Sequence, residues 1–216
     1  RKGNSYGCHE NYLMDRRTSF KRIVEPLLPF FATRQIWCGA GKVGSENRNH
    51  PCSYQLSQRA DFFETEVALD TMVKRPIVNT RDEPHADREK YRRLHVIVGD
   101  SNMSEYTIYL RNGVTALILS MIEDGAITKD LSLRDPVKAI REVSHDLTLA
   151  HELTMDDGTS RTALQIQQDF YEMMLAYASS RSLDPVQKDV IQKWGEVLEA
   201  LARDPMELDT RIDWVM

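Results

Sequence analysis

Cysteine is scarce in this sequence of 216 residues, and its few cysteines do not form a recognisable framework. Cys8, Cys38 and Cys52 are an odd number, and no two of them have CxxC spacing. This pattern argues against a set of disulfides and against a zinc site built from thiolates. An HExxH motif is also missing, which argues against an unrelated metal-dependent hydrolase. We therefore predict free thiols and a reducing, cytoplasmic location.

Long apolar runs and an excess of positive charge are missing as well. No run reaches the roughly 18 apolar residues that a membrane helix needs, and no signal peptide is recognisable. The net charge is −5, whereas a nucleic-acid-binding protein usually carries a basic surface. We expect neither a membrane nor a nucleic acid as partner. Because the chain opens at Arg1 and ends on an apolar Trp214–Met216, we interpret it as an internal fragment.

The chemistry is concentrated between Arg75 and Met103, RPIVNTRDEPHADREKYRRLHVIVGDSNM. Alternation over 91–100 predicts a half-buried strand, which places His95 among apolar neighbours. Upstream, Pro84 favours a shaped loop that contains Arg81. Imidazole is a common metal ligand and guanidinium suits phosphate. These residues indicate an anion-plus-metal site, such as one for a nucleotide with magnesium; alternatively, they are a solvated loop arginine and a structural histidine.

Two further stretches carry candidate ligands. If Lys2–Leu13 is a strand, His9 and Asn11 point the same way, toward a phosphate, a metal-bound water or simply a neighbouring backbone. Arg59 lies in a β-like run, SYQLSQRADFF, where it is either an inward-facing anion ligand or a charge that protects an edge strand.

The remaining pattern predicts mostly helices. Prolines 26 and 29 should kink or divide a helix over 18–36, and a capping box formed by Asn102 and Glu105 should start one over 101–124. Asp157-Gly158 signals a hairpin. We also expect a loop over 42–53, a second β-like run TEVAL, and helices that begin at Asp135, near Ala163, at Asp184 and at Asp204.

A catalytic triad is not expected, although Ser144, His145 and Asp146 supply its three residue types. They are consecutive, and neighbouring side chains point apart.

Four strings carry a resemblance to a known family: SYGCHENYL, SQRAD, RPIVNTRDEPHAD and YRRLHVIVGDSN. They resemble the enzymes that attach and process Pup, the prokaryotic ubiquitin-like protein, and the likeness runs from Ser5 to Val215. These enzymes are glutamine synthetase-like carboxylate–amine ligases. The resemblance implies an α+β fold in which a curved antiparallel sheet packs against helices and a smaller, mainly helical region follows. It assigns 1–130 to part of the catalytic domain and 131–216 to the helical continuation.

The resemblance also implies roles for the candidate residues. ATP and Mg²⁺ would lie on the sheet, with His95 as a magnesium ligand. Arg59 and Arg81 would hold phosphates, and His9 and Asn11 would face the phosphates and the metal. The catalytic residue is unknown in this chain, because the family's nucleophilic aspartate is expected upstream of Arg1.

Two enzymes of this family are candidates, and the sequence favours one. SQRADFFETEVALDTMVKRP looks like the Pup deamidase/depupylase, while GDSNMSE and RIDWV look like the Pup–protein ligase. We predict ATP/Mg-dependent deamidation of Pup's C-terminal glutamine, together with depupylation, which is cleavage of the isopeptide bond between Pup and pupylated proteins in the Pup–proteasome pathway. The alternatives are the ligase, which joins a Pup glutamate to a substrate lysine, and an inactive Pup-binding fragment.

Overall fold

The protein is an α+β structure, as predicted, in a computed structural model that describes residues 6–47, 49–68, 75–79, 82–83 and 85–216. Strands predominate in the first half and helices in the second. In chain order the elements are β1 Gly7–Asp15, α1 Phe20–Thr33, α2 Gln35–Cys38, β2 Lys42–Val43, β3 Tyr54–Gln55, the 3₁₀ helix η1 Ala60–Phe62, β4 Phe63–Ala68, β5 Arg75–Asn79, β6 Tyr91–Asp100, α3 Glu105–Asp124, α4 Pro136–His145, β7 Glu152–Thr154, β8 Ser160–Thr162, α5 Ala163–Ser179, α6 Pro185–Arg203 and the 3₁₀ helix η2 Pro205–Leu208.

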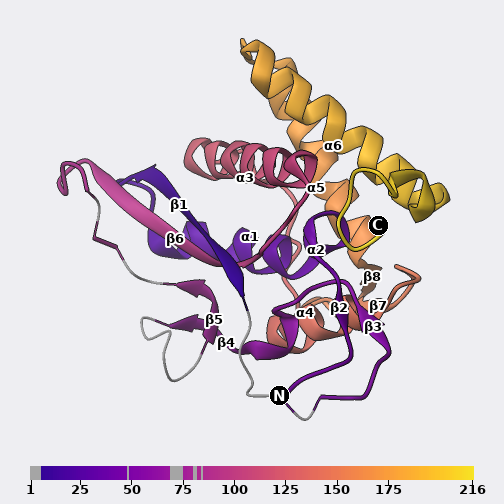
Figure 1. The fold of residues 1–216 in the computed structure, drawn as a ribbon. Coiled ribbons are helices and arrows are strands. Elements are labelled where there is room, and N and C mark those ends of the chain that lie inside the picture. Colours follow the sequence, from indigo (N-terminus) through magenta and orange to yellow (C-terminus); the bar gives the residue numbers. More distant parts are fainter. Residues whose placement is uncertain (1–5, 48, 69–74, 80–81, 84) are drawn as a thin grey trace.

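A long antiparallel ribbon of β1 and β6 runs from one side of the molecule into its middle (Figure 1). Its register places Asn11 opposite His95, and it shifts by one residue between Cys8 and Glu10. Such a bulge bends a strand and re-aims the side chain within it, which here is His9. The prediction of a half-buried β6 is wrong, because all residues from Leu94 to Asp100 are buried.

The other strands form small separate pairs. β2 with β3 and β7 with β8 are antiparallel, and the second pair confirms the hairpin predicted at Asp157-Gly158. Gly158 has a φ of 86°, which glycine adopts without strain. The antiparallel pairs agree with the predicted antiparallel sheet, and β4 with β5 adds one parallel pair. β2 also occupies the start of the segment that we predicted to be a loop.

Arg59 does not lie in a strand, contrary to the prediction. Only the two ends of that β-like run pair, Tyr54–Gln55 as β3 and Phe63 as the first residue of β4, and Arg59 directly precedes η1. The Ser57 hydroxyl accepts hydrogen bonds from the backbone N–H groups of Arg59 (3.0 Å) and Ala60 (3.2 Å). This local bonding gives the backbone an alternative to a β ladder.

The helix predicted over residues 18–36 is divided in two, which was one of the two predicted outcomes. α1 ends at Thr33 and α2 starts at Gln35, so the division lies at Arg34 rather than at a proline. The N-cap is Ser19, whose hydroxyl accepts from Arg22 N, so the helix starts two residues after the predicted start at residue 18.

The predicted capping box of α3 is wrong. Ser104 is the N-cap and accepts from Thr107 N, while the Asn102 amide donates to Cys38 O (3.1 Å) and to Asp213 (3.0 Å). The helix ends at residue 124 as predicted, and Gly125, with a φ of 70°, is its C-cap. Asp135 and Asp184 cap α4 and α6 as expected.

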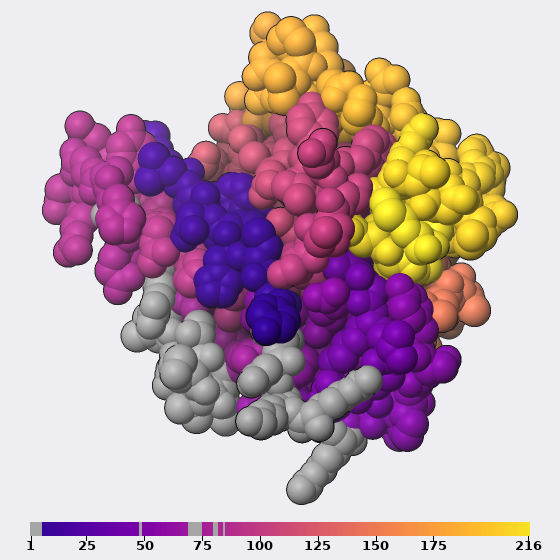
Figure 2. All heavy atoms as spheres, viewed as in Figure 1, coloured from indigo at the N-terminus to yellow at the C-terminus, as the bar shows by residue number. Residues whose placement is uncertain are grey.

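One hydrophobic core joins the ribbon to the helices. Trp37 of α2 lies edge-on to Trp194 of α6, and Phe30 of α1 lies edge-on to Phe170 of α5. Figure 1 shows α3, α5 and α6 gathered on one side of the ribbon, and α4 with the small strand pairs on the other. In Figure 2 the end of the ribbon near Tyr91 projects from this body. No helix among the described residues is long and apolar enough to cross a membrane. The boundary at residue 130 stays a prediction.

Candidate functional site

Two of the predicted ligands touch each other on one face of the ribbon. Nε2 of His95 lies 3.3 Å from Nδ1 of His9, and the rings meet edge to face. His95 is buried, whereas His9 is exposed at the bulge. Partial loss of solvent around the imidazole, followed by the positive charge of Arg59, lowers the pKa of His9. A neutral imidazole offers a lone pair to a metal, so both rings can present nitrogen toward one position.

Arg59 reaches the same face from the start of η1. Its guanidinium lies against Gly7 so closely that a Cβ on that glycine would overlap it. The guanidinium carbon is 6.0 Å from the centre of the Phe63 ring, and the side chain is buried. Within the part of the chain that the structure describes, Arg59 Nε is buried without a hydrogen-bond partner. A buried donor without an acceptor is costly, so this group is suited to an anionic ligand.

Arg75, at the start of β5, adds positive charge that the sequence analysis did not assign to the site. Burial and the nearby charge of Arg75 lower the pKa of Arg59, whose guanidinium still stays protonated at neutral pH. Arg75 itself lies over the Phe62 ring at 5.1 Å. Two guanidinium groups held together on aromatic rings make this corner attractive to phosphate. The only sequence signal for Arg75 is its place at the head of the arginine-rich stretch.

Asn11 pairs with His95 across the ribbon, but its side-chain amide oxygen bonds to another residue. That oxygen accepts a hydrogen bond from Arg93 (2.9 Å), and Arg93 also bonds the backbone oxygen of Glu83. Asn11 is exposed at the edge of the His9–His95 pair. Arg81, the remaining predicted ligand, lies outside the described residues.

Magnesium fits this set of residues only in part. The two imidazole nitrogens are close enough to share one cation, but magnesium prefers oxygen ligands. Over the described ranges, no group of three or more histidine, cysteine or acidic residues could hold a metal. A magnesium ion here would take its remaining ligands from phosphate oxygens or from groups outside the described residues.

The opposite face of the ribbon is fixed by a buried charge network that sequence reasoning missed. The Glu10 carboxylate accepts hydrogen bonds from Arg34 at 2.6 and 3.2 Å and from the Tyr12 hydroxyl at 2.6 Å. Arg111 Nε lies 3.7 Å from the same carboxylate. Because Glu10 directly follows His9, this anchor helps to hold the bulge in place. The alternation of β1 already puts Glu10 on the face opposite His9, and this is the signal available in the sequence.

Ser144, His145 and Asp146 have separate partners, in agreement with the sequence analysis. Ser144 donates to Gln55, His145 Nε2 lies 2.9 Å from the Asp61 carboxylate, and Asp146 accepts from Thr148. They do not form a catalytic unit.

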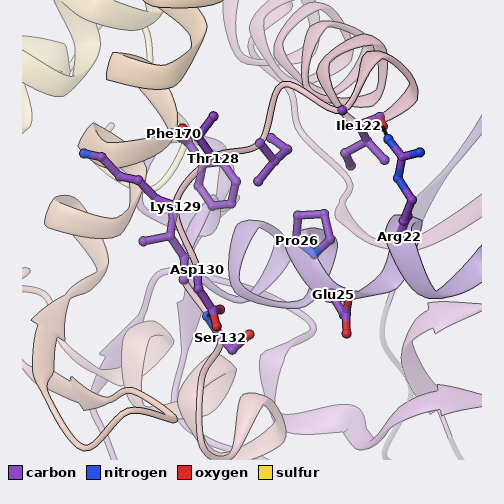
Figure 3. Close-up of a pocket in the computed structure, with 12 residues that line it drawn as sticks. Arg22, Glu25, Pro26, Ile122, Thr128, Lys129, Asp130, Ser132 and Phe170 are labelled. Carbon is purple, nitrogen blue, oxygen red and sulfur yellow. Dashed lines mark hydrogen bonds between the residues drawn. The ribbon is translucent and has the colours of Figure 1, made fainter.

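A separate cavity of about 460 Å³ lies between α1, the end of α3 and α5. Figure 3 shows Arg22 and Glu25 on one side of it, and Lys129, Thr128 and Phe170 on the other. Arg22 donates to Ile122 O, and Lys129 pairs with Asp169 of α5. This cavity shares no residue with the His9–His95 face.

Several enzymes of one pathway are similar to this chain. It is 55% identical over 217 residues to a depupylase of Acidothermus cellulolyticus, covering 99% of this chain and 43% of that protein. It is 51% identical to a Pup–protein ligase of Actinosynnema mirum and 47% identical to a Pup deamidase/depupylase of Mycolicibacterium smegmatis, covering 47% and 43% of them and 99% of this chain in each case. The chain therefore spans less than half the length of these relatives.

Solved structures give the same result for the fold. The Pup ligase PafA in complex with ADP matches with a TM-score of 0.86 and 42% identity, covering 98% of this chain and 48% of PafA. A complex between Pup and PafA matches with a TM-score of 0.87 and 44% identity, covering 98% of this chain and 44% of that one. The family described as Pup-ligase protein matches residues 1–216. This chain therefore belongs to the Pup-ligase protein family.

Proposed function

We propose that the complete protein containing this chain is an ATP- and magnesium-dependent Pup deamidase and depupylase in the Pup–proteasome pathway. The observation that carries the proposal is the convergence of Arg59 and the His9–His95 pair on one face of the ribbon. A relative named as a depupylase, at 55% identity, and one named as a Pup deamidase/depupylase, at 47% identity, support it. So does a similar structure that contains ADP.

The arginines and the histidines of the site have different proposed ligands. Arg59, with Arg75 and Arg81, would hold phosphate oxygens, while His95 and His9 would bind the cation. Magnesium, when bound, would neutralise phosphate charge and polarise the amide carbonyl of Pup's terminal side chain. Deamidation and depupylation attack the same kind of side-chain amide, so one site can serve both. Pup and pupylated proteins would be the partners, in the cytoplasm; all three cysteines are free, which suits that compartment.

The Pup–protein ligase is the second candidate, and a specific finding favours it. A ligase relative is 51% identical, and both similar structures are those of a ligase. The same arginines would then stabilise the transfer of phosphate to the terminal glutamate of Pup. A substrate lysine would afterwards attack that glutamate and displace the phosphate.

Two substrates separate these candidates. The complete protein would be supplied with Mg-ATP and with Pup ending either in glutamine or in glutamate plus an acceptor protein. Ammonia release from the glutamine form supports the deamidase. Conjugation of the glutamate form, without ammonia release from the glutamine form, contradicts it and supports the ligase.

A further inference from the structure

A turn of backbone links the buried end of β6 to the guanidinium of Arg59. Asp100, the last residue of β6, is buried, and its carboxylate collects three hydrogen bonds at 2.9 Å each. The donors are the backbone N–H groups of Ala40 and Gln58 and the hydroxyl of Ser57. Two segments distant in sequence are thus attached to one strand end.

Ser57 connects Asp100 to the backbone of Arg59 through hydrogen bonds of its hydroxyl group. While its hydroxyl hydrogen goes to Asp100, the same oxygen accepts from the backbone N–H groups of Arg59 and Ala60. The Ser57 N–H in turn donates to the Ser144 hydroxyl of α4 at 3.0 Å. Ser57 is buried, so water does not compete for these bonds.

The geometry closes into a loop at Gly7. Asp100 is paired with Gly7 across the ribbon, and Arg59 returns over Gly7 with its guanidinium. Asp100, which holds the base of the arginine, is therefore the pairing partner of Gly7, against which its guanidinium lies. Such an arrangement fixes both ends of a flexible side chain before any ligand binds.

We propose that Ser57 is a positioning residue: its hydroxyl, fixed by Asp100, holds the backbone from which Arg59 reaches a phosphate group at the His9–His95 face. This inference rests on the proposed function, because it assigns Arg59 to a nucleotide phosphate. Ser57 itself does not touch the ligand. Its effect must therefore disappear when the Arg59 side chain is removed.

A double-mutant cycle on ADP binding by the complete protein tests this. The variants are Ser57→Ala, Arg59→Ala and the double variant, measured by calorimetry with magnesium. Ser57→Ala is expected to weaken ADP affinity about 10- to 100-fold, as loss of a supporting group does at a preorganised site. In the Arg59→Ala background the same change is expected to have no further effect. Ser57→Thr, which keeps the hydroxyl, is expected to bind ADP more tightly than Ser57→Ala.

Thr33→Val is the matched control for lost stability. Thr33 is also buried, and its hydroxyl donates to Pro29 O and accepts from Gln167 away from the site. This variant is expected to lower the melting temperature yet leave ADP affinity unchanged. If Ser57→Ala weakens ADP affinity equally in the unaltered protein and in the Arg59→Ala background, the positioning role is overturned. The positioning role is also overturned if Ser57→Ala leaves ADP affinity unaltered while Arg59→Ala weakens it. If the unaltered protein does not bind ADP, the proposed function itself is overturned.

Discussion

His9 Nδ1 and His95 Nε2 lie 3.3 Å apart, across a ribbon whose register sets Asn11, not His9, directly opposite His95. His9 lies two residues from Asn11 and thus reaches His95 diagonally on the same face, at the position of the bulge between Cys8 and Glu10. Strand β1 thus supplies a charge anchor to one face and an imidazole to the other.

Removal of the divalent cation tests the histidine pair. ADP affinity of the complete protein is expected to fall when magnesium is replaced by a chelator, because the phosphates then lose a counter-charge. The ratio of ADP affinity with magnesium to ADP affinity without it should be about 10- to 100-fold smaller in His95→Ala than in the unaltered protein. Calorimetric titration with and without magnesium measures both effects. His151→Ala, an exposed histidine elsewhere, is the control, and an equal effect of magnesium in the His95 variant would contradict the assignment.

The Glu10–Arg34 ion pair predicts a large change in stability. Glu10→Gln leaves the Arg34 charge buried without its carboxylate, which costs about 3–5 kcal/mol when a buried pair is broken. The control is Glu25→Gln, which breaks an exposed pair with Lys21 and should cost at most about 1 kcal/mol. Denaturant titration of the complete protein compares them. Similar losses in the two variants would show that the Glu10 pair contributes no more than a surface contact.

Asp61 predicts a dependence of stability on pH. Burial alone would raise the pKa of Asp61, but hydrogen bonds from Gln55, Glu46 N and His145 together lower it below its usual range. Because the folded pKa is the lower one, the stabilisation is present above the unfolded pKa of about 3.9 and is lost as pH falls through the folded value. Melting temperatures measured from pH 7 to pH 3 should therefore fall more steeply in the unaltered protein than in Asp61→Asn. Parallel curves would contradict this.

Cys38 predicts a thiol that does not react in the folded protein. It is 4% exposed, and burial raises its pKa to about 12. Since the thiolate is the reactive form, Cys38 should resist a thiol reagent at pH 8 until the protein unfolds. Mass spectrometry of labelled peptides, with and without denaturant, reports the site of modification. Rapid labelling of Cys38 in the native protein would show that this core opens readily.

The sequence predicted the elements better than their boundaries. The strand through His95, the hairpin at Asp157-Gly158 and the caps at Asp135 and Asp184 followed from local chemistry. The N-cap of α3 did not, because Asn102 is drawn away by Asp213, which is 111 residues distant. Such a tertiary bond leaves no local pattern.

The candidate site shows the same division. His9, Asn11, Arg59 and His95 could be selected by residue type and by family resemblance, and the structure brings three of them, His9, Arg59 and His95, together. Ser57 and Arg75 could not, because their roles depend on the fold that sets Asp100 and Phe62 beside them. The expected β run around Arg59 failed because the hydroxyl of Ser57 captures the backbone N–H groups there.

Ammonia release from Pup ending in glutamine, by the complete protein with Mg-ATP, tests the central claim most directly. The unaltered protein and Arg203→Ala, whose exposed arginine pairs with Glu207, are expected to release ammonia at similar rates. Arg59→Ala is expected to lose at least about 100-fold in rate, because one preorganised charge is removed. No release by the unaltered protein, or full activity in Arg59→Ala, would contradict the account.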